Sequence, residues 1–304
     1  MIAITGGAGF IGSHLVDRLV SDKVLVIDNL SSSKLDYIKR HVDSKRVVFQ
    51  KTDIRKEFGV DSCDTLYHFA AIPDVRESTT NPRDVMEQNV AATINVLEAC
   101  RKGDVKKIIL ASTSTVYGNA KIPTPEDHPL NPISNYGASK VACEAMLRGY
   151  SESYGITAVA LRYANIFGPR SNHGVARDLF EKLMKNNNVL EIIGDGKQNK
   201  SYLYIDDCVD ATLLCTDKVK KGCVIINVGS SNQITVNEIA RIIAKELGLS
   251  PKIKYTGFSW TGDVLLMLLD TRKLQSLGWK QKIPEIEGLK LYIRWLKNKK
   301  AGQK

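Results

Sequence analysis

Short runs of apolar, strand-forming residues recur along the chain, and stretches with helical periodicity lie between several of them. The two clearest helical stretches are 82–102 and 136–153. Because strands that alternate with helices form a parallel sheet covered on both faces, the pattern predicts a doubly wound α/β fold. The expected strands are MIAIT (1–5), the run that ends at Asp28, RVVFQ (46–50), DTLYHFAA (64–71), KKIILAS (106–112) and TAVALR (157–162).

The first strand leads into a glycine-rich loop and an amphipathic helix. Gly6, Gly9 and Gly12 have the spacing GxxGxxG. This spacing provides a tight turn, lets the backbone approach a phosphate, and packs helix closely on strand. The helix N-terminus then attracts a pyrophosphate through its free N–H groups and its dipole. A βαβ unit without a ligand is the alternative.

Asp28 ends the next strand and strengthens the nucleotide-binding interpretation. A carboxylate at that position accepts hydrogen bonds from the adenosine ribose hydroxyls and repels a 2′-phosphate. The sequence therefore favours NAD over NADP as the cofactor.

Further polar positions follow the other predicted strands, where ligands collect in sheets of this type. They are Asp53, the turn at Phe69 to Ala71 and the turn at Ser112 to Thr115. His68 lies inside an apolar strand, so we expect a buried, hydrogen-bonded core histidine there and not a ligand.

Tyr136 and Lys140 lie four residues apart in the predicted helix that begins near SNYGASKVACEAM. This spacing places a phenol and an ammonium on the same helix face. One interpretation is a solvated polar face. The other is a general base, since a nearby cation and a positively charged nicotinamide both favour the phenolate over a phenol whose ordinary pKa is about 10.

Composition narrows the classes of protein that fit. With 43% apolar and 25% charged residues in 304, the chain resembles an ordinary soluble globular protein. Its net charge of +10 comes without a helix-turn-helix, RRM or zinc-finger pattern, so we expect no nucleic-acid partner. Six cysteines without CxxC spacing indicate buried thiols in a reducing compartment and no metal site. MIAIT leaves no room for a signal peptide and no apolar run approaches 18 residues, so we expect a cytoplasmic protein without a membrane partner.

Taken together, the motifs resemble a known family. TGGAGFIG, DNLSS, HFAA, STSTVYG, YGASK, RYANIFGPR and GDGKQNKSYLYIDD occur in the order found in extended short-chain dehydrogenases that act on nucleotide sugars, with the greatest likeness to archaeal and bacterial UDP-glucose 4-epimerases. The resemblance covers nearly the whole chain. It implies a Rossmann-type NAD-binding domain at 1–164 plus roughly 202–234, and a smaller C-terminal α/β domain for the nucleotide sugar at 165–201 plus 235–304.

The resemblance also implies roles for individual residues. Thr113, Tyr136 and Lys140 match the catalytic hydroxyl, tyrosine and lysine, with Ser112 as the fallback for Thr113. The residues expected to bind NAD are Gly6, Gly9, Phe10, Ile11, Gly12, Asp28, Asn29, Asp53, Ile54, Phe69, Ala70, Ala71, Asn89, Ser112, Tyr136, Lys140 and Tyr163. The residues expected to bind the UDP-sugar are Thr113, Tyr136, Asn165, His173, Gly174, Val175, Lys200 and Asp263.

Two stretches of the chain depart from the family pattern. Lys200 stands where relatives often carry an arginine, and it can neutralise phosphate only as a point charge. Ser259 and Trp260 stand where an arginine that grips the diphosphate usually precedes GD. We therefore expect the diphosphate to depend on Lys200, Arg170, Lys254 or backbone donors.

The resemblance favours 4-epimerisation of UDP-glucose and UDP-galactose, and several alternatives stay open. UDP-GlcNAc or UDP-glucuronate could be the substrate, and a keto-sugar reductase, a threonine-type dehydrogenase or a non-catalytic NAD-binding regulator would share much of the pattern. Sugar dehydratases and decarboxylases are disfavoured, because Ser114 and Thr115 replace their acidic residues. A homodimer is expected through a second apolar stripe on the helices at 82–102 and 136–153, which contains Val90, Ile94, Leu97, Ala145, Met146 and Leu147.

Overall fold

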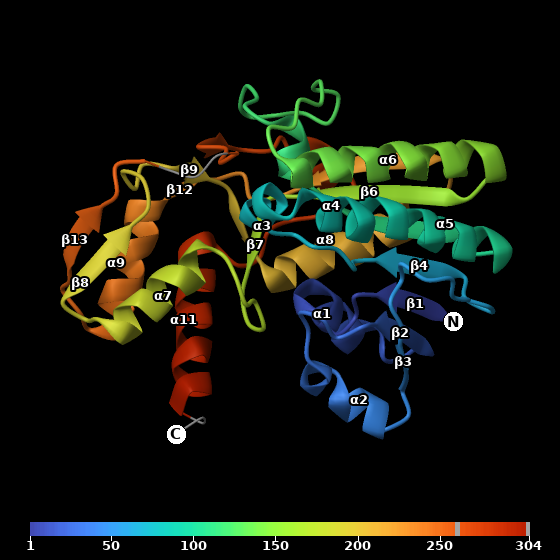
Figure 1. The fold of residues 1–304 in the computed structure, drawn as a ribbon, viewed down its shortest axis with the longest axis horizontal. Coiled ribbons are helices and arrows are strands. Elements are labelled where there is room, and N and C mark those ends of the chain that lie inside the picture. Colours follow the sequence, from blue (N-terminus) through green and yellow to red (C-terminus); the bar gives the residue numbers. More distant parts are fainter. Residues whose placement is uncertain (259–261, 302–304) are drawn as a thin grey trace.

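The computed structural model describes residues 1–258 and 262–301. Its larger part is a seven-stranded sheet with the order β11-β6-β5-β4-β1-β2-β3, and every neighbouring pair is parallel. All six expected strands are present in it, which confirms the α/β prediction (Figure 1). The strands are β1 (Ile2–Thr5), β2 (Val24–Asp28), β3 (Val47–Lys51), β4 (Thr65–His68), β5 (Lys107–Thr113), β6 (Thr157–Tyr163) and β11 (Cys223–Val228).

Helices cover both faces of this sheet and create two separate apolar cores. Neighbouring strand residues point to opposite faces. Ala3 therefore packs with helices α5 and α6, whereas Ile4 packs with α1 and α8. The helices around the sheet are α1 (Phe10–Leu19), α2 (Lys39–Asp43), α3 (Val75–Thr80), α4 (Pro82–Met86), α5 (Ala92–Lys102), α6 (Asn135–Tyr154) and α8 (Ile205–Lys218), with short 3-10 turns η1 (Leu35–Tyr37) and η3 (Ser114–Tyr117).

The helix predicted at 82–102 is not uniform. A π-helical segment, η2 (Glu87–Ala91), separates α4 from α5. Its Asn89 is buried and turns inward, where its side chain hydrogen-bonds the backbone of Ile72. π-helical turns often mark functional sites, and this one supports the loop that follows β4.

The helix predicted at 136–153 is α6. The Ser134 hydroxyl accepts a hydrogen bond from the backbone of Gly137 at its start, and Gly155 ends it in the left-handed conformation. The predicted second apolar stripe is only partly present. Leu97 and Leu147 are each 1% exposed and belong to the sheet-side core, so for these two residues the stripe prediction is wrong.

Smaller sheets make up the rest of the chain. Figure 1 shows α7, α9 and α11 gathered around them on the left, away from most of the large sheet, and α10 packs against β11. The strands are β7 (Asn165–Phe167) with β10 (Tyr202–Tyr204), β8 (Val189–Ile192) with β13 (Lys252–Tyr255), and β9 (Asn199–Lys200) between β12 (Ile234–Thr235) and β14 (Leu266–Met267). The helices are α7 (Val175–Lys185), α9 (Val236–Leu247), α10 (Arg272–Ser276) and α11 (Glu285–Ala301). The predicted domain boundaries stay a prediction.

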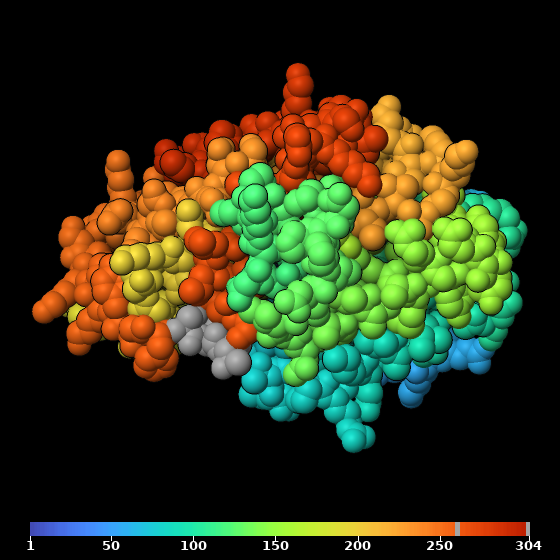
Figure 2. Space-filling model, turned by 90° about the horizontal axis from the view of Figure 1, so that it is seen from above, coloured from blue at the N-terminus to red at the C-terminus, as the bar shows by residue number. Residues whose placement is uncertain are grey.

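A long loop at 118–134 links η3 to α6 and packs against the chain near 268–270. In Figure 2 it is the green segment beside the orange-red chain near 262–271. Thr124 donates a backbone hydrogen bond to Leu268 and accepts one from Asp270. Across residues 1–258 and 262–301, the helices are all too short or too polar to cross a membrane.

Candidate active site

The carboxyl ends of the parallel strands bring most of the predicted site residues to one edge of the sheet. The register aligns Thr5, His68 and Leu110 on β1, β4 and β5. The glycine loop, the turn at Phe69 to Ala71 and Thr113 therefore follow one another along this edge. His68 is 3% exposed and its ring nitrogens hydrogen-bond the hydroxyls of Thr5 and Thr93, as predicted for a core histidine.

The glycine loop is shaped for an extended anionic ligand. Gly6 has φ +70°, and a Cβ there would lie 2.6 Å from the backbone nitrogen of Ala70. A Cβ on Gly12 would lie 2.3 Å from the carbonyl oxygen of Gly6. By contrast, a Cβ on Gly9 would meet only that same oxygen among the described atoms within 4 Å, at 3.1 Å, so this glycine faces open space.

Helix α1 begins at Phe10, directly after the glycine loop. In the described part of the chain no side chain caps its start, so the first N–H groups of Phe10, Ile11 and Gly12 are available to a ligand. Uncapped N–H groups, the helix dipole and the uncovered side of Gly9 suit a dinucleotide pyrophosphate. These residues therefore fit the predicted cofactor.

Asp28 is fixed beside this loop. Its carboxylate accepts hydrogen bonds from the backbone nitrogens of Ala8 and Leu30, at 3.0 and 2.8 Å, and from the Ser33 hydroxyl at 2.8 Å. Asn29 bonds the backbone of Ser31 and shapes the same loop. A buried carboxylate in this position repels a 2′-phosphate, which fits NAD better than NADP.

Other predicted cofactor residues have partners of their own within the chain. The carboxylate of Asp53 pairs with Arg55, and the hydrogen bonds from Arg55 lower the pKa of Asp53. The neighbouring Ile54 is buried. The hydroxyl of Tyr163 bonds Thr212 on α8 at 2.7 Å. Contacts of these residues with NAD remain a prediction.

Tyr136 and Lys140 lie on the first turns of α6, where that helix crosses the end of β5. Their exposed fractions are 8% and 3%, which rules out the solvated polar face. The ammonium of Lys140 donates to the backbone oxygen of Ala111 at 2.9 Å, and the Tyr136 hydroxyl is hydrogen-bonded to the side chain of Thr113. The three predicted catalytic residues therefore meet at one place.

Burial has the largest effect on the Tyr136 phenol in this structure, and the predicted joint effect of Lys140 and a nicotinamide on its pKa stays a prediction. Burial raises the pKa of Tyr136 to about 12, and the hydrogen bond with Thr113 is the interaction that lowers it. Lys140 is itself buried, which lowers its pKa, and its ammonium is directed at Ala111. A phenolate at neutral pH therefore needs positive charge in addition to that of Lys140.

The structure also separates the two candidate hydroxyls on β5. Ser112 donates its hydroxyl hydrogen bond to Glu144, about two turns along α6 from Tyr136. Thr113 faces Tyr136, and its hydroxyl lies 3.1 Å from that of Thr115. The hydroxyl beside the tyrosine is thus Thr113 and not the fallback Ser112.

The predicted sugar-binding residues lie on the smaller sheets and the loops around them. Asn165 donates to the backbone oxygen of Ser201 at 3.0 Å, and Lys200 pairs with Asp263 at 2.6 Å. His173 and Gly174 are exposed in the loop that leads to Val175 at the start of α7. The ion pair lowers the net positive charge that Lys200 can offer an anion.

The other residues suggested for the diphosphate are placed differently. Arg170 pairs with Asp17 of α1 at 2.6 Å and lies over the ring of Tyr37. Asp17 also pairs with Arg40, so this carboxylate offsets only part of the charge of Arg170. Lys254 is exposed on β13. The substituted positions Ser259 and Trp260 lie outside the described residues.

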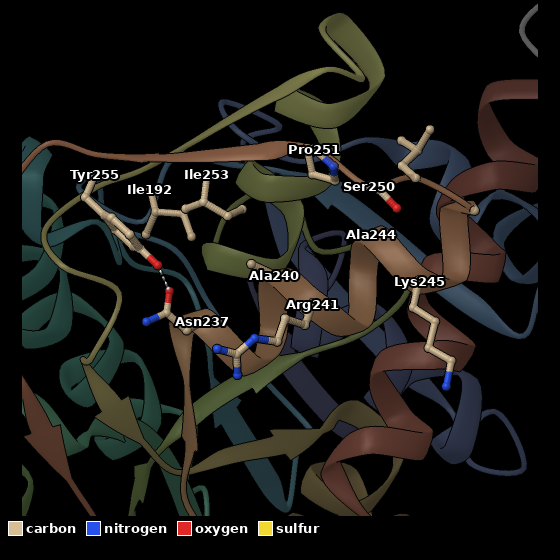
Figure 3. Close-up of a pocket in the computed structure, with 12 residues that line it drawn as sticks. Ile192, Asn237, Ala240, Arg241, Ala244, Lys245, Ser250, Pro251, Ile253 and Tyr255 are labelled. Carbon is tan, nitrogen blue, oxygen red and sulfur yellow. Dashed lines mark hydrogen bonds between the residues drawn. The ribbon is translucent and has the colours of Figure 1, made fainter.

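A cavity of about 520 Å³ lies elsewhere, between α9 and the β8–β13 strands (Figure 3). The close-up shows the Tyr255 hydroxyl pointing to Asn237 at one end, with Arg241 and Lys245 along the helix. None of the described residues that line it belongs to the predicted site. The cavity therefore adds nothing to the arrangement around Tyr136.

The sequence reasoning missed a buried polar network directly behind the site. Glu144, on α6, forms a two-pronged ion pair with Arg162 of β6, and both are almost completely buried. Arg162 also donates to the hydroxyl of Tyr117. One signal was available: Glu144 follows Lys140 by four residues, and an arginine interrupts an otherwise apolar strand run.

Comparison with known proteins places this arrangement in context. The model of the NAD dependent epimerase/dehydratase family matches residues 2–229. A putative UDP-glucose 4-epimerase of Methanocaldococcus jannaschii is 36% identical, over 98% of this chain and 99% of the relative. A crystal structure of a UDP-galactose 4-epimerase is 42% identical with a TM-score of 0.88, over 98% and 99% of the two chains. A UDP-glucuronic acid 4-epimerase from Bacillus cereus, in complex with UDP-glucuronic acid and NAD, is 30% identical with a TM-score of 0.90, over 98% and 99%.

Proposed function

The chain belongs to the NAD-dependent epimerase/dehydratase family, and from that premise we propose that it interconverts the two C4 epimers of a UDP-hexose, with UDP-glucose and UDP-galactose as the first candidates. One observation carries the proposal. The Tyr136 hydroxyl is buried beside Thr113 at the strand edge that also holds the glycine loop. That arrangement suits proton transfer to and from a sugar hydroxyl next to a dinucleotide.

The chain's own residues handle the proton at the sugar O4 atom. Tyr136 takes the proton from the 4-hydroxyl as a carbonyl forms at C4, and later returns it to the oxygen of the inverted sugar. Thr113 donates a hydrogen bond to the same oxygen. Lys140 holds the ribose next to the nicotinamide. When bound, NAD supplies the two-electron oxidation and reduction at C4, together with a positive charge that favours the phenolate.

Inversion requires that the hexose turns over while the rest of the substrate stays bound. Firm contacts with the nucleotide and diphosphate, and loose contacts with the sugar, meet this requirement. We assign the firm contacts to Asn165, the loop at His173 to Val175, and the Lys200–Asp263 pair. Because Asp263 offsets the charge of Lys200, backbone donors carry part of the diphosphate binding.

Other reactions of the same fold are less compatible with these residues. A dehydratase needs an acid and a base near C5 and C6, and Ser114 and Thr115 provide neither. A keto-sugar reductase would use the same three catalytic residues but would consume NADH in proportion to product. A non-catalytic regulator would have no need for Tyr136 and Lys140 buried together at the strand edge.

We also propose a cytoplasmic homodimer. All six cysteines are free and five are buried, as expected in a reducing compartment. Helices α5 and α6 pack side by side (Figure 1), and Ile94 on their outward side is 43% exposed. A second copy pairing across these helices would cover it.

The proposal is tested by incubating the purified protein, without added NAD, with UDP-galactose, UDP-GlcNAc and UDP-glucuronate in separate reactions. We expect conversion of at least UDP-galactose to its C4 epimer, with no net change in absorbance at the NADH wavelength. Conversion of UDP-glucuronate or UDP-GlcNAc alone would change the hexose and keep the reaction. Protein that contains NAD and converts none of the three would contradict the proposed function.

Replacing Thr113 by valine should slow the reaction and change its pH dependence. The substitution removes the hydrogen bond that lowers the pKa of Tyr136, so the acid limb of the kcat profile should move to higher pH. We expect kcat to fall by about 10- to 100-fold, because part of the positioned acid–base catalysis is lost. The measurement is kcat from pH 6 to 10. An unchanged acid limb would show that Thr113 does not act on Tyr136.

A further inference from the structure

The buried network behind the active site has an arrangement that fold stability alone does not explain. Glu144 and Arg162 are 5% and 2% exposed, and two hydrogen bonds of 3.0 and 2.7 Å join them. Replacing a buried ion pair by apolar residues of similar volume is often neutral or stabilising, so such a pair is weak evidence for a role in stability. A role in fixing the positions of neighbouring side chains explains this buried pair better than a role in stability.

The network connects the elements that carry the three catalytic residues. Glu144 lies one helical turn after Lys140 on α6, and it accepts the hydrogen bond from Ser112, the residue next to Thr113 on β5. This contact joins α6 to β5 at the point where Tyr136 meets Thr113. Any shift of the helix along the strand would break it.

The polar groups of Arg162 are satisfied on its other side as well. The Nη1 atom of Arg162 donates to the Tyr117 hydroxyl at 2.7 Å and to the Glu126 carbonyl at 2.9 Å. The guanidinium lies 4.7 Å from the centre of the Tyr117 ring. Tyr117 in turn donates to Asn227, whose side chain bonds the carbonyls of Thr124 and Asp270. The network thus extends to the 118–134 loop and to the chain that follows Asp263.

We propose that Ser112, Glu144 and Arg162 form a positioning unit. The ion pair with Arg162 fixes the Glu144 carboxylate, and the hydrogen bond from Ser112 to that carboxylate fixes the end of β5. The distance between Thr113 and Tyr136 is set in this way. The three residues of the unit hold no proton that is transferred in the reaction. They act through Thr113. The inference rests on the proposed function, because its consequence is a change in how Tyr136 works.

Ser112→Ala is the sharpest test, because it removes the link to β5 and leaves the Glu144–Arg162 ion pair in place. We expect kcat to fall about tenfold, since small misplacement of a catalytic group can cost up to about 100-fold. KM and the NAD content of the purified protein should stay at wild-type values. The acid limb of the kcat profile should move to higher pH, as it should for Thr113→Val.

Ser151→Ala is the matched control. Ser151 is also buried on α6, and its hydroxyl has no hydrogen-bond partner among the described residues. Both variants delete one buried hydroxyl. Ser112→Ala should unfold at a lower temperature than Ser151→Ala, because it also removes a hydrogen bond to a buried carboxylate. Both should stay folded at the assay temperature, and only Ser112→Ala should lose activity. Equal kcat in the two variants would overturn the proposal, and loss of NAD from Ser112→Ala would assign that hydroxyl to cofactor binding instead.

A double-mutant cycle separates an effect through Thr113 from a general one. If Ser112 acts through Thr113, then Ser112→Ala should change kcat less than twofold in a Thr113→Val background. A further tenfold loss there would show that the effects are independent and would refute the proposed route. An inactive wild-type protein would instead refute the proposed function, so the two failures are distinguishable.

Discussion

Replacing Tyr136 by phenylalanine is expected to lower kcat by about 100- to 10,000-fold, the usual contribution of a positioned acid–base group. The ring keeps its packing, since Tyr136 is 8% exposed and only its hydroxyl is removed. Bound NAD and KM for the UDP-sugar should therefore change little. Initial rates and the NAD released from denatured protein measure both quantities.

Tyr67→Phe provides the control for this substitution. Tyr67 is also buried, at 1% exposure, but it lies within β4 and its hydroxyl bonds Thr216, away from the predicted catalytic residues. The two variants delete the same atom from similar surroundings. Wild-type turnover in the Tyr136 variant, or equal losses in both, would remove Tyr136 from the role of base.

Gly9→Ala is expected to weaken NAD binding by about 10- to 100-fold, which corresponds to the ~1–3 kcal/mol that overpacking of a tight contact costs. The backbone of Gly9 has φ −79° and ψ −172°, a conformation that alanine adopts readily. The added methyl group meets little of the protein itself and would occupy the space where a pyrophosphate approaches α1. The folded chain should therefore survive without its cofactor, as thermal unfolding and NAD content would show.

Gly149→Ala makes the same chemical change on α6. No described atom lies within 4 Å of the new methyl group, and alanine in a helix is favoured over glycine by roughly 0.5–1 kcal/mol. This variant should keep its NAD and unfold at a slightly higher temperature. Full NAD content in Gly9→Ala would show that the ligand does not approach the loop at that position.

The fold was predictable because the signals are local. Strands buried on both faces appear as continuous apolar runs, and the glycine loop and Asp28 follow directly from such runs. Interactions between distant residues gave no comparable signal. The pairing of Lys200 with Asp263 and of Glu144 with Arg162 depends on how separate elements pack, and the π-helical turn at Asn89 depends on an inward contact with Ile72.

The active-site prediction shows the same limit at the scale of single side chains. Four-residue spacing correctly placed Tyr136 and Lys140 on one buried face of α6. It did not show that the ammonium turns to the carbonyl of Ala111, nor that burial would raise the pKa of the phenol to about 12. Periodicity identifies a shared face, whereas electrostatics depends on where the charged ends of the side chains lie.

The proposed reaction requires that the Tyr136 hydroxyl contacts the sugar O4 atom in the loaded protein. A crystal structure of the protein with NAD and a UDP-hexose would measure this directly. We predict that the hydroxyls of Tyr136 and Thr113 both lie within hydrogen-bond distance, about 2.6–3.2 Å, of the sugar O4 atom. A Tyr136 ring turned away from the sugar, or a different sugar oxygen between these two hydroxyls, would contradict it.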